Sequence, residues 1–390
     1  MTSAQVSATA PRQAVWDGVS NLLDHFAAIE PADDVFLLYT PDAKDPAAWI
    51  VAELLSRDIR PTLIGMAPVR DDTLEQRLRQ ALPVPGNVAS RIVIFTVERD
   101  SMSHVLQLRR VLAPYPEHTW AMFRMINASA EFFEHSMNVT PQLLSAVNGA
   151  LLNRMMPAER LHITSSSGTD LEVEVDSRRY RWLSNRGVWR PGAFLVLPPG
   201  EVSTFPARVN GVLVADGAFN VTAYTRADAR LADHPVSIEI EEGRVAHATC
   251  ESPEVERLLR RCLAYDNGDR IGELGFGTNI GTPGFIPMNS HINERHPGVH
   301  LGLGQHGQLI DVAGYWSDIH LDLITSDARI TVDGRTRIDS ADLAGFRHET
   351  HPAPKAEGLH EEDIDGDCCG LISSEVARIR DESLRMRECS

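Results

Sequence analysis

The sequence predicts an α/β N-terminal domain, with a parallel sheet and flanking helices, followed by an α+β, sheet-rich C-terminal domain. The chain has 390 residues and 43% hydrophobic content, which is enough for two ordinary domains with cores of their own. Residues 12–125 alternate short apolar strands with amphipathic helices, the pattern of crossover units on a parallel sheet. After residue 156 the pattern becomes strand-like and is interrupted by turns.

Four strands and four helices are expected in the first domain. The strand patterns are DDVFLLYT, RPTLIGMA, RIVIFTV and TWAMFRM. The helical patterns are AVWDGVSNLLDHFAAI, DPAAWIVAELLSRD, DTLEQRLRQAL and SHVLQLRRVL. No strand is followed by G-x-G-x-x-G or G-x-x-x-x-G-K-[ST], so the domain has no recognisable motif for binding a dinucleotide or a nucleoside triphosphate. We expect this domain to act as a scaffold.

A linking helix is expected at residues 140–155, TPQLLSAVNGALLNRM, with Thr140 as its N-cap and Pro141 in its first turn. Beyond it, RLHITSSSGTDLEVEV begins a run of strands and turns that contains one clear helix, SPEVERLLRRCLAY. The predicted division is a frayed tail at 1–11, the α/β domain with its linking helix at 12–155, the second domain at 156–345, and an acidic, polar extension at 346–390.

Charge and composition exclude several classes of partner. The formal net charge of −17 argues against nucleic acid, because phosphate backbones are bound by an excess of Lys and Arg. No apolar run approaches the roughly 20 residues that a membrane span needs, and the N-terminus lacks a signal pattern, so we expect a cytoplasmic protein. The five cysteines show no CxxC spacing and are expected to be reduced thiols. A small-molecule substrate is the expected partner.

Side chains that can bind metal concentrate between residues 273 and 322. Five of the fifteen histidines, His291, His296, His300, His306 and His320, lie in this stretch together with Glu273, Glu294 and Asp322. His320 and Asp322 stand two positions apart on a predicted strand, so both project from one face. An isolated H-x-D is also typical of a strand histidine hydrogen-bonded to a carboxylate. With the neighbouring acids and imidazoles, nitrogen and carboxylate ligands suit zinc, manganese, cobalt or ferrous iron.

The segments GELGFGTN, INERHPGVHLGLG and SDIHLD followed by ITVDG resemble the metal-binding half of the aminopeptidase T-type leucyl aminopeptidases. SSSGTDLEV also resembles a strand of that family. The resemblance implies that a pair of divalent metals is bound by Glu273, Glu294, His300, His320 and Asp322. The family's tyrosine, seven residues beyond the first of these histidines, is replaced here by Gly307.

GELGFGTN and the HLD triplet also resemble 2,5-dihydroxypyridine 5,6-dioxygenase, a relative that opens an aromatic ring at one ferrous ion. The resemblance places a histidine of that enzyme at the position of Glu273. Because the aminopeptidase ligand set is the one fully kept, the first expectation is a metal-dependent hydrolase acting on an amide or peptide-like bond of a small substrate. The alternatives are a mononuclear ferrous ring-cleaving dioxygenase and a metal-binding protein without catalysis.

The resemblance and the charges suggest roles for the remaining residues. Glu273 is expected to be a metal ligand or the general base, and sequence leaves both open. His306 or His296 is expected to replace the missing tyrosine as donor to a developing oxyanion, with a surface loop histidine as the alternative. Arg295 is expected to bind a substrate carboxylate or to pair with a nearby acid. Relatives of this fold imply a homodimer.

Overall fold

The computed structural model of the protein describes residues 12–68, 70–99, 104–352 and 359–361. The expected tail at 1–11 and most of the expected extension at 346–390 lie outside the described residues. No helix in the described ranges is both long and apolar enough to cross a bilayer.

The N-terminal part is built on a five-stranded sheet in which neighbouring strands run parallel in the order β2, β1, β3, β4, β8. The strands are β1 (Asp34–Tyr39), β2 (Thr62–Gly65), β3 (Ile92–Val97), β4 (Trp120–Met125) and β8 (Phe194–Leu197). The central strands β3 and β4 are buried along their whole length, because helices cover both faces. The predicted parallel sheet with flanking helices is confirmed.

Helices α1 and α2 share one hydrophobic core with one face of this sheet, and α3 and α4 share another core with the opposite face. The main helices are α1 (Gln13–Asn21), α2 (Lys44–Ser56), α3 (Leu74–Ala81) and α4 (Val105–Leu112). Single π- or 3₁₀-turns accompany them at η1 (Leu22–Phe26), η2 (Pro41–Ala43), η3 (Glu117–Thr119) and η4 (Phe132–Ser136). This is the doubly wound arrangement that the alternating pattern predicts.

One strand of the first sheet comes from beyond the expected domain boundary. β8 pairs with β4, although the sequence division placed residues 156–345 in the second domain. Its sequence FLVL has the apolar character of any buried strand, and only the pairing partner shows which sheet it joins. Directly after β8 the chain passes through Pro198, Pro199 and Gly200 into β9. The carboxyl edge of the parallel sheet therefore leads into the second part of the molecule.

The second part contains two seven-stranded sheets. The first, which we call the support sheet, has the order β13, β12, β10, β6, β5, β17, β18. Its strands are β5 (Arg160–Thr164), β6 (Asp170–Glu174), β10 (Arg208–Ala215), β12 (Val236–Glu241), β13 (Arg244–Cys250), β17 (Arg329–Val332) and β18 (Thr336–Asp339). The second, the site sheet, has the order β11, β16, β15, β14, β9, β7, β19. Its strands are β7 (Trp182–Asn185), β9 (Glu201–Thr204), β11 (Ala218–Val221), β14 (Ile271–Gly277), β15 (Gly298–Gly304), β16 (His320–Ile324) and β19 (Leu359–Glu361).

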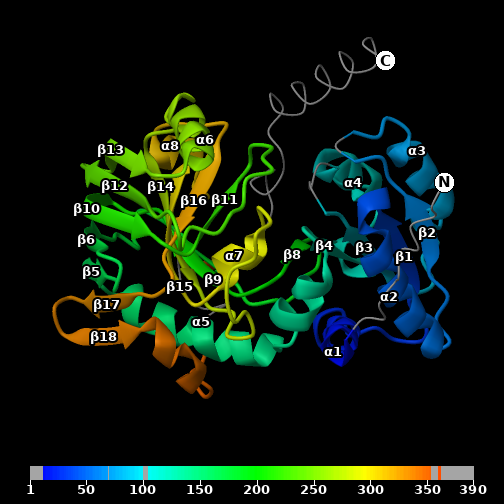
Figure 1. Ribbon diagram of the computed structural model, residues 1–390. Coiled ribbons are helices and arrows are strands. Elements are labelled where there is room, and N and C mark those ends of the chain that lie inside the picture. The colour runs from blue at the N-terminus through cyan, green and yellow to red at the C-terminus, as the bar shows by residue number, and fades with distance from the viewer. Residues whose placement is uncertain (1–11, 69, 100–103, 353–358, 362–390) are drawn as a thin grey trace, which may run out of the picture.

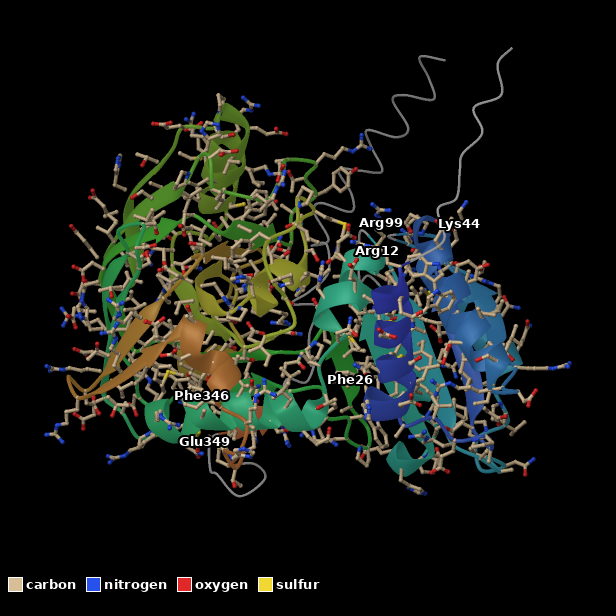
Figure 2. All side chains as sticks on the ribbon, turned by 60° about the horizontal axis from the view of Figure 1, so that its bottom comes forward. Arg12, Phe26, Lys44, Arg99, Phe346 and Glu349 are labelled. Carbon is tan, nitrogen blue, oxygen red and sulfur yellow. The ribbon has the colours of Figure 1, made fainter. Side chains whose placement is uncertain are left out.

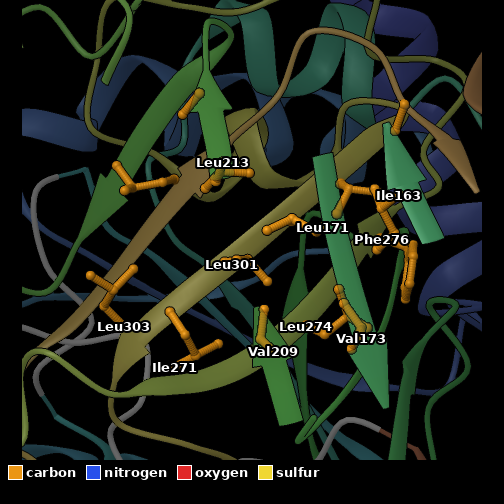
Figure 3. Close-up of a cluster of buried hydrophobic side chains, with 14 of the residues drawn as sticks. Ile163, Leu171, Val173, Val209, Leu213, Ile271, Leu274, Phe276, Leu301 and Leu303 are labelled. Carbon is orange, nitrogen blue, oxygen red and sulfur yellow. The ribbon is translucent and has the colours of Figure 1, made fainter. Parts of the chain in front are cut away.

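The two sheets pack face to face around one hydrophobic core. Ile163, Leu171 and Val209 of the support sheet meet Leu274, Phe276 and Leu301 of the site sheet in this core (Figure 3). Because successive side chains of a strand point to opposite faces, the residues between these apolar ones are directed to the other face of the site sheet. The sheet-rich character predicted for the second domain is confirmed.

The predicted linking helix is α5 (Pro141–Met155), and Thr140 caps it by accepting a hydrogen bond from the Leu143 N–H at 3.3 Å. The predicted second helix is α6 (Pro253–Leu263), capped by Ser252. Residues after η5 (Ser340–Gly345) return to α5, where Glu349 pairs with Arg154 (Figure 2). Helix α5 therefore anchors the end of the second part.

The described residues also form two short helices, α7 (His291–Arg295) and α8 (Ile310–Ala313). α7 packs on β11, β14 and β16 of the site sheet and also on η4. Its Ile292 belongs to the hydrophobic core of the N-terminal part. α7 therefore lies between the two parts of the molecule and over the site sheet (Figure 1).

Candidate metal centre

One face of the site sheet carries acids, imidazoles and glycines in register across four strands. Glu273 on β14 pairs with Gly302 on β15, which pairs with Asp322 on β16, which in turn pairs with Asn220 on β11. In the next row, Gly275 on β14 lies opposite His300 on β15. His320 and Asp322, which the sequence predicts on one face of a strand, therefore share that face of the sheet with residues of three other strands.

The glycines of this face leave room for the polar side chains. A Cβ at Gly302 would lie 2.8 Å from Glu273 Cβ, 2.8 Å from His320 Cε1 and 3.0 Å from Asp322 Oδ1. A Cβ at Gly275 would lie 1.9 Å from His300 Nε2. Because these distances are far below an ordinary contact of about 3.5 Å, neither position tolerates a side chain while the histidines and acids stay in place.

The first group of potential metal donors comprises Glu273, His320 and Asp322, each of which offers an atom within 4.8 Å of the others. His320 Nε2 lies 3.1 Å from Asp322 Oδ1. His320 Nδ1 lies 3.1 Å from the Gln305 carbonyl oxygen. A hydrogen bond from Nδ1–H to this carbonyl leaves Nε2 as the free nitrogen, the arrangement that orients metal-binding histidines.

The second group comprises Glu201, Glu273 and His300, again within 4.8 Å. His300 Nε2 lies 3.0 Å from Glu201 Oε1 and 3.5 Å from Glu273 Oε1. Glu273 is therefore common to both groups. A shared carboxylate between two sets of ligands is an arrangement that holds two metals about 3.5 to 4 Å apart.

Helix α7 adds charged side chains over this face. Glu294 accepts a hydrogen bond from the Asn220 amide and lies 3.4 Å from Arg295 Nη1. Arg295 is ion-paired with Glu201. His291 is buried on the same helix, and burial, together with the charge of Arg295, lowers its pKa to about 3. Four carboxyl groups and one arginine thus meet in a buried region.

The carboxyl groups divide into two kinds. Burial opposes ionisation of Glu201, but the charges of Arg295 and His300 outweigh it and lower the pKa of Glu201 to about 2. The pKa of Asp322 is lowered, against the effect of burial, by His320. Burial raises the pKa of Glu273, and burial together with the charge of Asp322 raises the pKa of Glu294 well above its ordinary value. Burial and neighbouring charges therefore divide the four carboxyls into two whose pKa is lowered and two whose pKa is raised.

The site fits divalent metal ions. Both carboxylate oxygens of Asp322 are buried without a hydrogen bond of good geometry in the described residues, although Oδ1 lies 3.1 Å from His320 Nε2. Nδ1 of His300 is likewise buried without a hydrogen-bond partner in the described part of the chain. Buried charged atoms without hydrogen bonds are costly unless an ion or a water satisfies them. Carboxylate and imidazole donors on one dry sheet face are the ligands that zinc, manganese, cobalt and ferrous iron prefer.

Of the five predicted ligands, four lie in the two donor groups: Glu273, His300, His320 and Asp322. Glu294 lies in neither group and is held by Asn220 and Arg295 instead. Arg295, predicted to bind a substrate carboxylate or to pair with a nearby acid, is fully buried and its guanidinium pairs with Glu201. The alternative expectation, pairing with a nearby acid, describes its position.

Neither of the two predicted oxyanion donors, His306 and His296, belongs to a donor group. His306 Nε2 is 2.9 Å from the Tyr315 carbonyl, and Nδ1 accepts from the Gln308 N–H at 3.3 Å, so both nitrogens are occupied within the protein. His296 packs on the Phe285 ring with centroids 4.4 Å apart. A tyrosine could not replace Gly307 without displacing Leu183, because a Cβ there would lie 2.6 Å from Leu183 Cδ1.

Sequence reasoning missed Glu201. It stands in PPGEVST, at the start of a strand that follows two prolines and a glycine, and it is 72 residues before Glu273. The only local signal is an acid at the beginning of a short strand whose four residues are all buried. Asn220 was missed for the same reason, since its importance comes from its register opposite Asp322.

Comparisons with known proteins agree with this architecture. A family profile described as NicX, 2,5-dihydroxypyridine 5,6-dioxygenase, matches residues 120–277. The structure of 2,5-dihydroxypyridine dioxygenase from Pseudomonas putida KT2440 is similar with a TM-score of 0.56 and 14% identity, over 84% of this chain and 95% of that chain. Wild-type AmpT from Thermus thermophilus is similar with a TM-score of 0.51 and 16% identity, over 84% of this chain and 97% of that chain.

The chain has the fold of these two proteins. The resemblance predicted from GELGFGTN, INERHPGVHLGLG and SDIHLD, to aminopeptidase T and to the dioxygenase, is thereby confirmed. The family profile ends at residue 277, so of the residues in the donor groups it includes Glu201 and Glu273. A search of curated protein sequences finds no match.

Proposed function

We propose that this protein is a metal-dependent hydrolase that binds two divalent ions and cleaves an amide or peptide-like bond of a small substrate. The observation that carries the proposal is the presence of two donor groups that share Glu273. Paired divalent ions, when bound, polarise a carbonyl group and lower the pKa of water toward 7.

Each donor group would hold one ion. Glu273, His320 and Asp322 would hold one ion, and Glu201, Glu273 and His300 the other. Because Glu273 belongs to both groups, we assign it the role of a ligand rather than that of the general base. The Gln305 carbonyl keeps the His320 ring in the orientation that directs Nε2 to the site.

Glu294 is the carboxyl group available for proton transfer, because it belongs to neither donor group and lies beside them on α7. Asn220 and Arg295 fix its two oxygens. We assign to Glu294 the acceptance of a proton from the attacking water and its return to the leaving amine. The burial of the surrounding residues excludes bulk water from this step.

A single-ion dioxygenase is the second candidate. It is favoured by the family profile over residues 120–277. The fold neighbours include both a dioxygenase and AmpT, so fold alone favours neither reaction.

Parallel assays separate the two reactions. The protein loaded with Mn²⁺, Co²⁺ or Zn²⁺ is incubated with libraries of aminoacyl amides and short peptides, and the protein loaded anaerobically with Fe²⁺ is given hydroxylated aromatic rings while O₂ consumption is followed. We expect hydrolysis that is lost in Glu294→Gln. O₂ consumption with ring opening, and no hydrolysis, would replace the first proposal by the second.

A further inference from the structure

Arg295 is the one member of the described centre whose positive charge is permanent. It is fully buried on α7, ion-paired with Glu201 through Nη1, and its Nε donates to the Pro198 carbonyl at 3.1 Å. The same Nη1 lies 3.4 Å from Glu294 Oε2. A guanidinium keeps its proton under all conditions in which proteins are folded, whereas an imidazole can lose its own.

The two donor groups differ in what lies beside their carboxylate. In the first group Asp322 faces His320, which is itself a member of that group. In the second group Glu201 directs Oε1 to His300 and gives Oε2 to Arg295. One carboxylate oxygen of the second group is therefore already paired with a cation that metal binding does not remove.

A fixed charge at this position weakens the attraction for a second ion. Like charges repel strongly in a buried region, because little water is there to screen them. Arg295 both repels an ion bound by Glu201 and His300 and restricts Glu201 to a single donor oxygen. The first group has the same ligand count, and its Asp322 faces His320 of the same group.

We propose that the positive charge of Arg295 partly substitutes for the charge of an ion at the second donor group. The two metal positions then differ in affinity. The ion held by Glu273, His320 and Asp322 binds tightly, and the ion held by Glu201, Glu273 and His300 binds weakly and exchanges. The inference rests on the two-ion centre of the proposed function. It implies that the chain binds one ion at a low concentration of free metal. As that concentration rises, the chain binds the second ion and becomes able to hydrolyse its substrate.

Titration of the metal-free protein with MnCl₂ alone, followed by calorimetry and by equilibrium dialysis, tests this inference. The wild-type protein should show two binding steps whose dissociation constants differ by about 100-fold or more. In Arg295→Met the weaker step should strengthen by about tenfold or more, while the tighter step changes by less than about threefold. A weaker step that is unchanged or further weakened in Arg295→Met overturns the inference.

Three further variants control the experiment. Arg295→Lys keeps a cation and should keep two unequal steps, and Glu201→Gln with Arg295→Met should lose the weaker step altogether. Arg124→Met removes another fully buried arginine, paired with Glu98 at 2.8 Å in the parallel-sheet domain, and should leave both steps as in the wild type. A change of the weaker step in Arg124→Met equal to that in Arg295→Met also overturns the inference.

Loss of folding would not prevent a decision. If Arg295→Met folds only when MnCl₂ is present, the refolded chain should hold two ions at a free Mn²⁺ concentration at which the wild type holds one. Failure of Arg295→Met to refold with Mn²⁺ counts against the inference. The outcomes also separate the two proposals. A wild-type protein that binds no ion contradicts the two-ion centre itself, whereas two equal steps contradict only the role of Arg295.

Discussion

Gly302→Ala is predicted to weaken metal binding at the first donor group while the fold survives. The new methyl group would lie 2.8 Å from Glu273 Cβ and from His320 Cε1, and 3.0 Å from Asp322 Oδ1, which are the three residues of the first donor group. Carbon atoms in ordinary contact are about 3.5 Å apart or more, so the residues around the methyl must move by about 0.7 Å.

The magnitude follows from this displacement. Overpacking of this size costs about 1–3 kcal/mol of folding free energy, which an ordinary domain tolerates. Displaced side chains no longer direct their donor atoms to one point. We therefore expect Mn²⁺ affinity at the first position to fall by about 100-fold or more, or about 2.8 kcal/mol. Calorimetric titration with MnCl₂ measures the affinity, and circular dichroism with thermal unfolding checks the fold.

Two other glycines provide matched comparisons. Gly275→Ala places its methyl 1.9 Å from His300 Nε2 and should impair the second position more than the first. Gly65→Ala, at the end of β2, meets no atom within 4 Å and should bind Mn²⁺ as the wild type does. Wild-type affinity at both positions in folded Gly302→Ala would refute the reasoning, since the three residues could then not be the ligands.

Three more predictions concern the ligands, the pH dependence and the linking helix. Glu273→Gln should lower Mn²⁺ binding at both positions and Glu201→Gln at only one, as counted by equilibrium dialysis; equal losses in the two variants would contradict the sharing of Glu273. Burial lowers the pKa of His351 to about 4, and its Nε2 lies 3.0 Å from Ser184 Oγ. The unfolded chain binds this proton below about pH 6.5, so the stability from neutral His351 is complete above that pH and is lost as pH falls toward the folded pKa. His351→Gln should therefore shrink the difference in unfolding free energy between pH 7.5 and pH 5 by about 1 kcal/mol in urea titrations, and an undiminished difference would count against this. Thr140→Ala should destabilise the protein by about 1 kcal/mol in the same assay through loss of the α5 cap, whereas Thr140→Ser should be close to neutral.

Much of the fold follows from local patterns. The alternation of strands and helices before residue 125 predicts the parallel sheet, and Thr140 followed by Pro141 predicts the start of α5. These signals lie within a few residues of the features that they predict. The placement of β8 was not predictable, because a short buried strand carries no information about its partner.

The centre was predictable only where its residues cluster in the chain. His320 and Asp322 are two positions apart on one strand, and their common face follows from strand geometry alone. Glu201 enters the site through the pairing of β9 with β14, a contact across more than seventy residues that no local pattern encodes. The burial of Arg295 was equally hidden, since an arginine within a charged HINER segment has the pattern of an exposed helix end.

Electron paramagnetic resonance of the protein loaded with Mn²⁺ tests the shared Glu273 most directly. At two equivalents of Mn²⁺ per chain we predict an exchange-coupled signal from paired ions, because a bridging carboxylate holds two metals about 3.5 to 4 Å apart. In Glu273→Gln the coupled signal should disappear. A spectrum of isolated, uncoupled Mn²⁺ at every loading of the wild-type protein would contradict the two-ion centre and favour a single-ion site.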